Sequence, residues 1–209
     1  MRLNKLLIIS IIIYLASQAG AQTGNWGLGP HLFVSLPQSG FDNLSKDGEG
    51  LGAKAFYRFN NNYISLRADF AYLSYGERRE AEMISIGYGL ITRRNESFQF
   101  TLGPQGTFRT GIVTLYLAGM AGLYNYRTVV TYEDYYYTTY PYNETSDSQT
   151  KWGWNGSAGL LFDIGLGPYI DLGFKYQRIL DAKTVTETGS YEQDASDFVI
   201  TLGVVFFVQ

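Results

Sequence analysis

Seven charged residues stand at alternate positions in segments whose other alternate positions are apolar. Successive side chains of a β-strand point to opposite faces, so these charges would share the face opposite the apolar side chains. If the sheet closes on itself, they meet in its interior. Buried charges must be paired, because the desolvation of each one costs several kcal/mol. These residues predict a salt-bridged plug, and a small proton or ion pathway is the alternative. The seven residues are Lys54, Arg58, Arg67, Asp69, Asp163, Asp171 and Lys175.

His31 is the only histidine, and it is the first residue to consider for catalysis. Ser35 and Asp42 follow it along the chain. Residues four apart on a strand are separated by about 13 Å at ~3.3 Å per residue, so Ser35 cannot contact His31 along that strand. The segment Asp42–Glu49 lacks the ligand spacing of a calcium loop. We therefore expect no catalytic residues, no metal site, no cofactor and no enzymatic activity.

A second group of residues suggests recognition rather than catalysis. Within Tyr132–Glu144, tyrosine recurs six times, and its rigid ring with a polar tip suits contact with proteins or glycans. The alternative is that these rings only pack within a β-hairpin. The residues are Tyr132, Tyr135, Tyr136, Tyr137, Tyr140 and Tyr142.

The elements that would position these residues are strands. In Phe198–Val208, every second side chain is large and apolar, and the other register is smaller and mixed, which is typical of a strand with one lipid-facing surface. Gly203, on the inner register, would leave space for a neighbouring charged side chain. The same alternation predicts strands over Trp26–Leu36, Leu51–Phe59, Tyr63–Tyr75, Ser97–Phe108, Ile112–Val130, Thr150–Ile164, Tyr169–Leu180 and Asp197–Val208.

The segment Met83–Arg93 also alternates and would make a ninth strand. Single-chain bacterial barrels have an even number of strands, with short periplasmic turns and long outer loops. Because Tyr63–Tyr75 and Ile112–Val130 must both run outward, one inward strand fits between them. Met83–Arg93 is then an extracellular extension, and eight strands cross the membrane. The outer loops are expected at Pro37–Gly48, Gly76–Glu96, Tyr132–Gln149 and Asp181–Ser196, and the turns at Asn60–Asn62, Arg109–Gly111 and Gly165–Pro168.

The apolar register is consistent from strand to strand, and the charges lie in the other. A soluble lipocalin-like barrel would show the reverse, an apolar lumen within a polar outside. Aromatic residues near the strand ends predict interfacial girdles of Trp26, Tyr57, Tyr72, Trp152, Trp154 and Tyr176. The fold class is an all-β, transmembrane, antiparallel up-and-down barrel.

The first 21 residues carry the features of a secretory signal peptide. Arg2 and Lys5 precede the apolar run Leu6–Ala16, and Ala19–Ala21 is a small-residue cleavage site. The expected parts are thus a cleaved signal at 1–21 and a barrel domain at 22–209. Cysteine is absent, which excludes disulfides, and a net charge of −3 gives no reason to expect nucleic-acid binding.

Four segments together with the signal peptide resemble the small outer-membrane β-barrel family that includes the OmpA and OmpX types. They are Leu51–Phe59, Phe98–Gln105, Leu115–Tyr124 and Phe198–Val208. The resemblance implies the outer membrane of a Gram-negative bacterium, contact with its lipid, and insertion by the barrel-assembly machinery. The expected role is structural or interactive, with extracellular loops displayed at the cell surface for a protein or glycan partner. A narrow pore for small solutes or ions is the alternative, and a lipid-modifying enzyme is the third possibility.

Overall fold

The computed structural model describes residues 26–38, 46–59, 63–84, 87–134, 143–165, 167–186 and 189–208. The expected signal peptide at 1–21, Asp42 and five of the six loop tyrosines, from Tyr135 to Tyr142, lie outside the described residues. The described strands are β1 Trp26–Gln38, β2 Gly48–Arg58, β3 Ile64–Tyr75, β4 Arg78–Ile84, β5 Gly87–Thr110, β6 Val113–Asp134, β7 Asn143–Asp163, β8 Tyr169–Thr186 and β9 Gly189–Val208. None of these residues forms a helix long and apolar enough to cross a bilayer.

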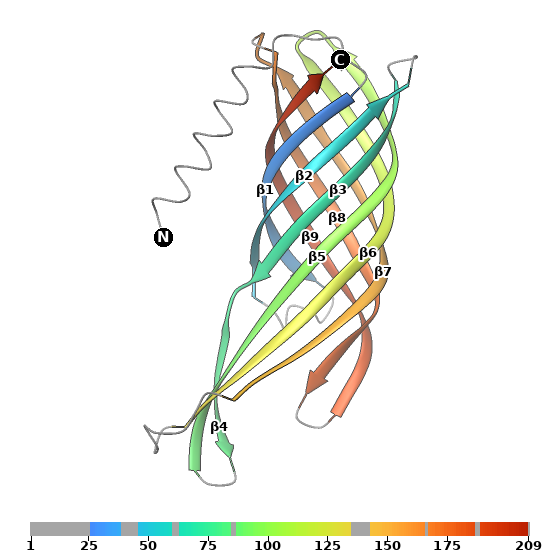
Figure 1. Cartoon of the computed structure of the whole chain (residues 1–209). Helices are drawn as coiled ribbons and strands as arrows, with labels where there is room; N and C mark the ends of the chain where they lie inside the picture. The colour runs from blue at the N-terminus through green and yellow to red at the C-terminus, as the bar shows by residue number, and fades with distance from the viewer. Residues whose placement is uncertain are drawn as a thin grey trace.

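The strands form one antiparallel sheet that closes into a barrel (Figure 1). Each strand pairs with its neighbour in the chain, except that β3 pairs with β5 and not with β4. β1 also pairs with β9, so that His31 lies opposite Gly203. Closure leaves no unpaired edge in the bilayer, where an unpaired backbone group costs several kcal/mol. The predicted fold class is confirmed.

The predicted count of eight membrane strands is also confirmed. β3 pairs directly with β5 from Ile64 opposite Gly106 to Ser74 opposite Glu96. β4 pairs only with the start of β5, from Arg78 opposite Arg93 to Ile84 opposite Gly87. Omitting β4 from the nine strands of the sheet therefore leaves eight that close the barrel. β4 and the start of β5 form a hairpin beyond the barrel, at the end away from the short turns (Figure 1).

Three predicted outer loops were wrong in their extent. β6 continues to Asp134 and β7 begins at Asn143, well inside the predicted loop Tyr132–Gln149. β8 and β9 likewise run into Asp181–Ser196, and β4 and β5 into Gly76–Glu96. A hairpin surrounded by water needs no apolar face, so these segments, apart from Met83–Arg93, lack the alternation that marks a half-buried strand.

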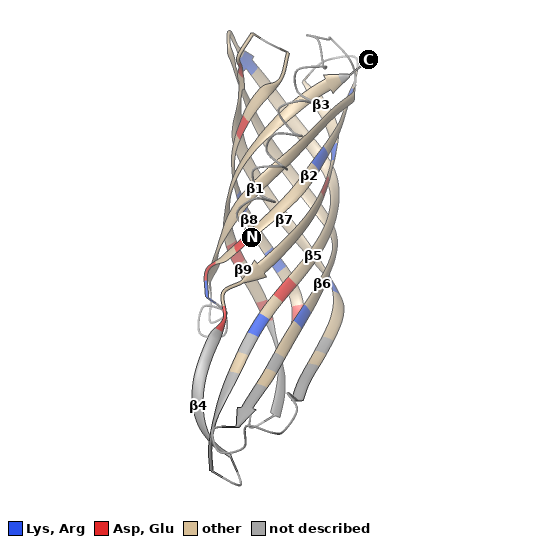
Figure 2. Cartoon of the chain, turned by 60° about the vertical axis from the view of Figure 1, so that its left-hand side comes forward, with Lys and Arg blue, Asp and Glu red and all other residues tan. Residues whose placement is uncertain are grey.

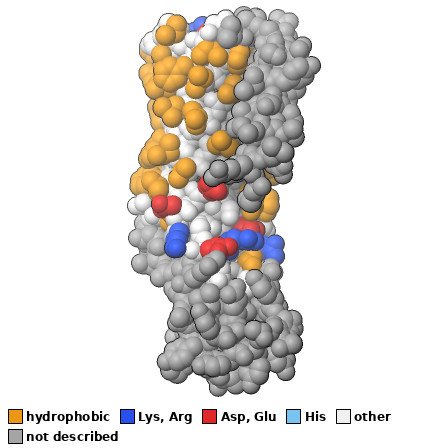
Figure 3. Space-filling view, turned by 90° about the vertical axis from the view of Figure 1, so that its left-hand side faces the viewer, with side chains coloured by type: hydrophobic (Ala, Val, Ile, Leu, Met, Phe, Trp, Pro, Cys, Tyr) orange, Lys and Arg blue, Asp and Glu red, His pale blue; other side chains and the backbone are white. Residues whose placement is uncertain are grey.

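The outside of the barrel is apolar and the inside is polar or tightly packed. Along β1, Leu28, Leu32 and Val34 are 55%, 62% and 49% exposed, whereas His31 and Ser35 between them are buried. The same alternation runs along the other membrane strands, and Figure 3 shows hydrophobic side chains covering the barrel wall up to a band of charged ones. This is the pattern of a lipid-facing barrel.

Aromatic side chains gather near both ends of the apolar wall. Trp26 contacts Tyr57 at the turn end, with ring centroids 4.8 Å apart. At the loop end Tyr72 contacts Phe98 at 4.7 Å, and Trp154 contacts Tyr176 at 5.7 Å. From Trp26 to Leu36 at the other end, β1 rises about 33 Å along its axis and about 25 Å across the bilayer at a typical tilt, which matches the apolar band of such barrels.

The turn end of the barrel is tight. Gly111, between β5 and β6, has φ +60°, and Gly165, between β7 and β8, has φ +74°. Only glycine adopts these angles without strain, which explains its presence in the short predicted turns.

Candidate functional site

The centre of the lumen holds a buried ion pair between strands β2 and β8. Lys54 Nζ donates to Asp171 Oδ2 at 2.5 Å, and both side chains are 1% exposed. The other Asp171 oxygen accepts a hydrogen bond from the Tyr116 hydroxyl at 2.9 Å. Lys54 also donates to the Thr201 hydroxyl at 3.4 Å. These contacts join four strands of the barrel wall across its interior.

A second ion pair lies beside the first and involves two residues of β3. The Arg67 guanidinium donates to both carboxylate oxygens of Asp69, at 2.7 and 2.8 Å. Its remaining nitrogen donates to Gln105 at 3.2 Å and to Ser157 at 3.4 Å. The guanidinium also lies 5.4 Å from the centre of the Tyr116 ring. A bidentate pair with neutral hydrogen-bond partners is the arrangement in which a buried arginine is best stabilised.

Lys175 is the third cation of this layer. It is buried, and its Nζ donates to Gln99 at 3.3 Å and lies 5.7 Å from the Phe33 ring. Asp197 is a further inward-facing carboxylate, and the sequence reasoning missed it. Asp197 is buried and accepts hydrogen bonds from Tyr75 at 2.5 Å and from Gln177 at 2.9 Å. Its position on the same register as Val199 and Thr201 is the signal that identifies it as inward-facing.

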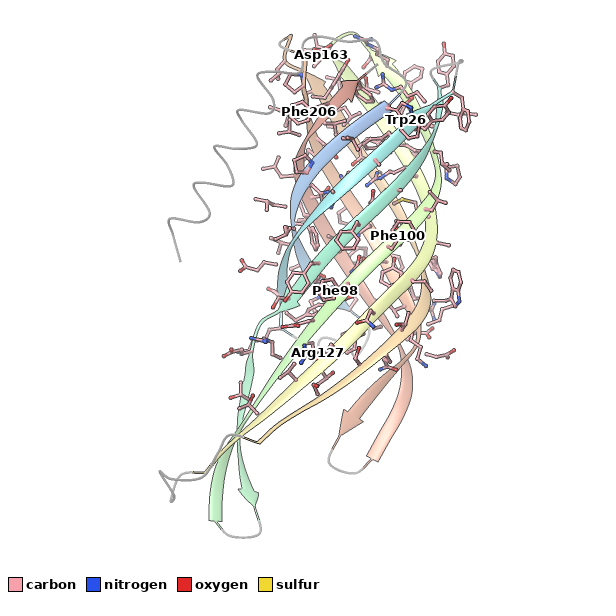
Figure 4. The ribbon with its side chains drawn as sticks, viewed as in Figure 1. Trp26, Phe98, Phe100, Arg127, Asp163 and Phe206 are labelled. Atoms are coloured by element: carbon pink, nitrogen blue, oxygen red, sulfur yellow. The ribbon has the colours of Figure 1, made fainter. Side chains whose placement is uncertain are left out.

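Two of the seven predicted lumen residues lie apart from this layer. Arg58 is at the turn end, where its guanidinium stacks 3.4 Å from the centre of the Phe207 ring. Asp163 is on the rim, 27% exposed, and pairs with Arg109 at 3.4 Å (Figure 4). Water reaches the rim, so these two charges need no partner within the lumen. Asp163 is on the inward register of β7, but the strand ends at that residue, so its side chain lies at the rim and outside the charged layer.

His31 is part of the packed lumen. Its side chain is buried, and its ring fills the space beside Gly52 and lies 5.6 Å from Phe33. A Cβ on Gly203 would lie 2.8 Å from the Cβ of His31, so this histidine, and not a charged side chain, occupies the space that Gly203 leaves. Ser35 is on the same strand, four residues away.

Two clusters of packed apolar side chains close the charged layer on either side. Toward the turns lie Phe56, Tyr116, Leu161, Val205 and Phe207, with Tyr169 packed against them. Toward the loops lie Phe33, Ala71, Leu73, Tyr75, Tyr124, Tyr126, Ile179, Ala195 and Val199. Figure 2 shows Lys and Arg in blue and Asp and Glu in red at several levels along the strands. An eight-stranded barrel has room for little besides its own side chains, and here those side chains form three layers.

The described residues contain no cluster of three or more histidine, cysteine or acidic side chains that would hold a metal ion. Of the six predicted recognition tyrosines, Tyr132 lies in β6, near the end of the hairpin that β6 forms with β7. Among the described residues, packed and ion-paired side chains fill the lumen, and the β4–β5, β6–β7 and β8–β9 hairpins extend beyond it.

Comparison with known proteins agrees with this geometry. The chain shares its fold with Neisserial surface protein A at 17% identity and a TM-score of 0.54, over 88% of this chain and 97% of that one. Ail of Yersinia pestis matches with 18% identity and a TM-score of 0.48, over 88% of this chain and all of that one. OprG of Pseudomonas aeruginosa matches with 14% identity and a TM-score of 0.47, over 91% and 99%. No curated protein sequence matches this chain. The model of the outer membrane protein beta-barrel domain matches residues 6–206, and the chain therefore belongs to this family of bacterial outer-membrane proteins.

Proposed function

We propose that this protein is a non-conducting outer-membrane anchor that displays β-hairpins outside the cell for recognition of a protein or a glycan. The observation that carries the proposal is the filled lumen. The ion pairs Lys54–Asp171 and Arg67–Asp69 lie between two packed apolar clusters, so an ion would have to displace side chains at three successive levels.

The hairpins support the second half of the proposal. β6 continues from Leu123, the last large apolar residue on its outer face, to Asp134. Eleven residues of strand extend about 36 Å. This is longer than the headgroup region that the chain must cross beyond the apolar belt of the barrel. β5 and β7 run beside β6 over this length (Figure 1). A structured extension of this size is unnecessary for anchoring and suits surface recognition.

The two alternatives fare less well on the same contacts. A narrow pore would require the Lys54–Asp171 pair and both apolar clusters to rearrange. A lipid-modifying enzyme would require His31 to reach lipid, yet its side chain is 4% exposed and points into the lumen. We infer no catalytic role for it.

Planar-bilayer recording tests the closed lumen. The purified, refolded barrel is expected to give no discrete conductance steps, because the interior is packed. A variant that shortens side chains at all three levels, Phe56→Ala, Arg67→Ala and Leu73→Ala, is the positive control for detection. Stable unitary steps from the unaltered protein would refute the anchor and favour the pore.

Substitution of the hairpin tyrosines tests recognition. The variant replaces Tyr132, Tyr135, Tyr136, Tyr137, Tyr140 and Tyr142 with serine. We expect binding of intact cells to host-cell or glycan surfaces to be lost, while barrel folding, followed by heat-dependent gel mobility, is unchanged. The matched control replaces Tyr57 and Tyr63, at the turn end, with serine. Equal binding by both variants would contradict the role of the hairpin.

We also propose that residues 1–21 are removed during export and that the barrel-assembly machinery inserts the remainder. The mass of the protein extracted from outer membranes tests the first point. A mature chain that still begins at Met1 would contradict it.

A further inference from the structure

The outward-facing residues of β5, β6 and β7 change character within a few residues at the loop end of the barrel. Cross-strand pairing aligns Phe100, Leu123 and Trp152 in one row, all of them apolar and exposed. The next row toward the loops is Phe98, Asn125 and Thr150, and the row after that is Glu96, Arg127 and Ser148. Figure 4 shows Phe100, Phe98 and Arg127 following one another in this direction. The surface thus passes from hydrocarbon-like to polar over two rows.

The polar side of this boundary is a defined patch of six residues, here named the β5–β7 patch. Its members are Arg94, Glu96, Asn125, Arg127, Ser148 and Thr150. Asn125 donates to Thr150 at 3.0 Å and accepts from Ser148 at 3.3 Å. Arg94 pairs with Glu96 at 3.0 Å, and Arg127 lies opposite Glu96 in the register. One carboxylate therefore faces two guanidinium groups, and the patch carries a net charge of +1.

The height of the patch limits what can contact it. Two rows correspond to four residues, or about 13 Å along the strand and about 10 Å along the bilayer normal at a typical tilt. This places the patch at the level of the headgroups of the outer leaflet. Its side chains lie on the outward register of the strands, where Arg94, Ser148 and Thr150 are exposed, Asn125 and Arg127 are half-buried, and Glu96 is buried among its neighbours.

The chemistry of the patch matches a phosphorylated sugar. Guanidinium groups bind phosphate through paired, charge-assisted hydrogen bonds. The amide and the two hydroxyls of Asn125, Ser148 and Thr150 suit sugar hydroxyls, and Trp152 below them contacts the acyl chains. We propose that the β5–β7 patch binds the phosphorylated headgroup of an outer-leaflet glycolipid.

The same row shows that the site is confined to one side of the barrel. Continued through β3, the row of Arg127 passes Ser74, then the exposed Glu49 of β2 and then the apolar Val34 of β1. Phosphate would be repelled at Glu49. The lipid is therefore held at β5–β7 and not around the whole circumference.

The test uses the full mature protein, refolded in zwitterionic detergent. It is titrated with bis-phosphorylated lipid A, with the same lipid after removal of both phosphates, and with inorganic phosphate. Tryptophan emission reports binding, because Trp152 lies directly below Thr150 on the outer face. We expect saturable binding of the phosphorylated lipid only, and Arg127→Gln to weaken it by about tenfold or more, as loss of a hydrogen-bonded charge contact does.

The matched control is Glu49→Gln, which removes a charge from the same row, three strands away from Arg127, and should leave the affinity unchanged. Should Arg127→Gln fail to fold, Arg94→Gln carries the same expectation. Equal binding of both lipids, or unaltered affinity in the arginine variant, would overturn the proposal in favour of cross-strand pairs that only stabilise the sheet. An equal response to inorganic phosphate would replace the lipid by a soluble anion. Neither result bears on whether the hairpins recognise a partner.

Discussion

Removal of the charge of Asp171 is expected to be among the most destabilising single changes in this barrel. The Lys54–Asp171 pair has a 2.5 Å separation, with both side chains 1% exposed. At an effective dielectric constant of 20, the attraction between the two charges is about 7 kcal/mol. Most of it offsets the cost of desolvating both ions. Loss of one partner leaves that cost in place for the other, and typically destabilises a protein by about 3–5 kcal/mol.

Asp171→Asn isolates the charge from the shape of the side chain. In the unaltered protein the Tyr116 hydroxyl donates to Asp171 at 2.9 Å. The amide oxygen of asparagine can still accept this hydrogen bond. Its amino group then faces the ammonium of Lys54, which keeps only Thr201 as a neutral partner, at 3.4 Å. We expect the free energy of unfolding to fall by about 3–5 kcal/mol.

The measurement is denaturant-induced unfolding of the barrel in lipid vesicles, followed by the emission of its three tryptophans and by gel mobility. Lys54→Met and the double variant complete a mutant cycle. The loss of unfolding free energy in the double variant should be smaller than the sum of the two single losses by about 2 kcal/mol or more. Asp163→Asn is the matched control, since its pair with Arg109 is longer and exposed, and it should change stability by less than about 0.5 kcal/mol. A loss below about 1 kcal/mol for Asp171→Asn, or an additive cycle, would refute the reasoning.

Two further predictions concern packing and the outer hairpins. Gly203→Ala should destabilise the barrel by about 1–3 kcal/mol in the same assay, because the new Cβ would lie 2.7 Å from the Pro30 carbonyl oxygen. Gly119→Ala is the control and should not destabilise it, because a Cβ there would have nothing within 4 Å. Equal effects of the two substitutions would contradict this account. The hydrogen bonds from the Asp181 backbone and from Arg178 lower the pKa of Asp194 below its usual 3.8. The ionised carboxylate therefore stabilises the start of the β8–β9 hairpin above about pH 4, and this stabilisation is lost as the pH falls through the lowered pKa. Proteolysis within β8–β9 should therefore rise at low pH in the natural protein, whereas Asp194→Asn should be susceptible at every pH; a natural protein insensitive to pH would count against this contact.

The membrane strands were predictable because their signal is local. In Phe198–Val208, each lipid-facing position must be apolar. The alternation of apolar and other residues therefore predicts the strand, its two faces and its length. The parity of the chain then assigned Met83–Arg93 correctly to an extension outside the barrel. The other hairpin segments beyond the belt were not predictable in extent, because both of their faces meet water and, outside Met83–Arg93, the sequence carries no period-two apolar signal there.

The lumen residues were predictable in part. Register alone placed Lys54, Arg67, Asp69, Asp171 and Lys175 on the inner face, and each is buried. Asp197 obeyed the same rule but stood at the start of its predicted strand, where a polar residue resembles the end of a loop. Asp163 is also on the inner register, but its strand ends at the rim, so register alone did not show that it lies outside the charged layer.

The identity of the strands and of their two faces was determined by the sequence, since each depends on residues two apart along one segment. The partners within the lumen were decided only by the closed barrel. Lys54 and Asp171 are 117 positions apart in the chain, and Tyr75 and Asp197 are 122 apart. They meet because every pairing around the sheet, including that of β1 with β9, sets the stagger at which the cylinder closes. Since that stagger is a property of all eight membrane strands together, no single segment of the sequence contains it.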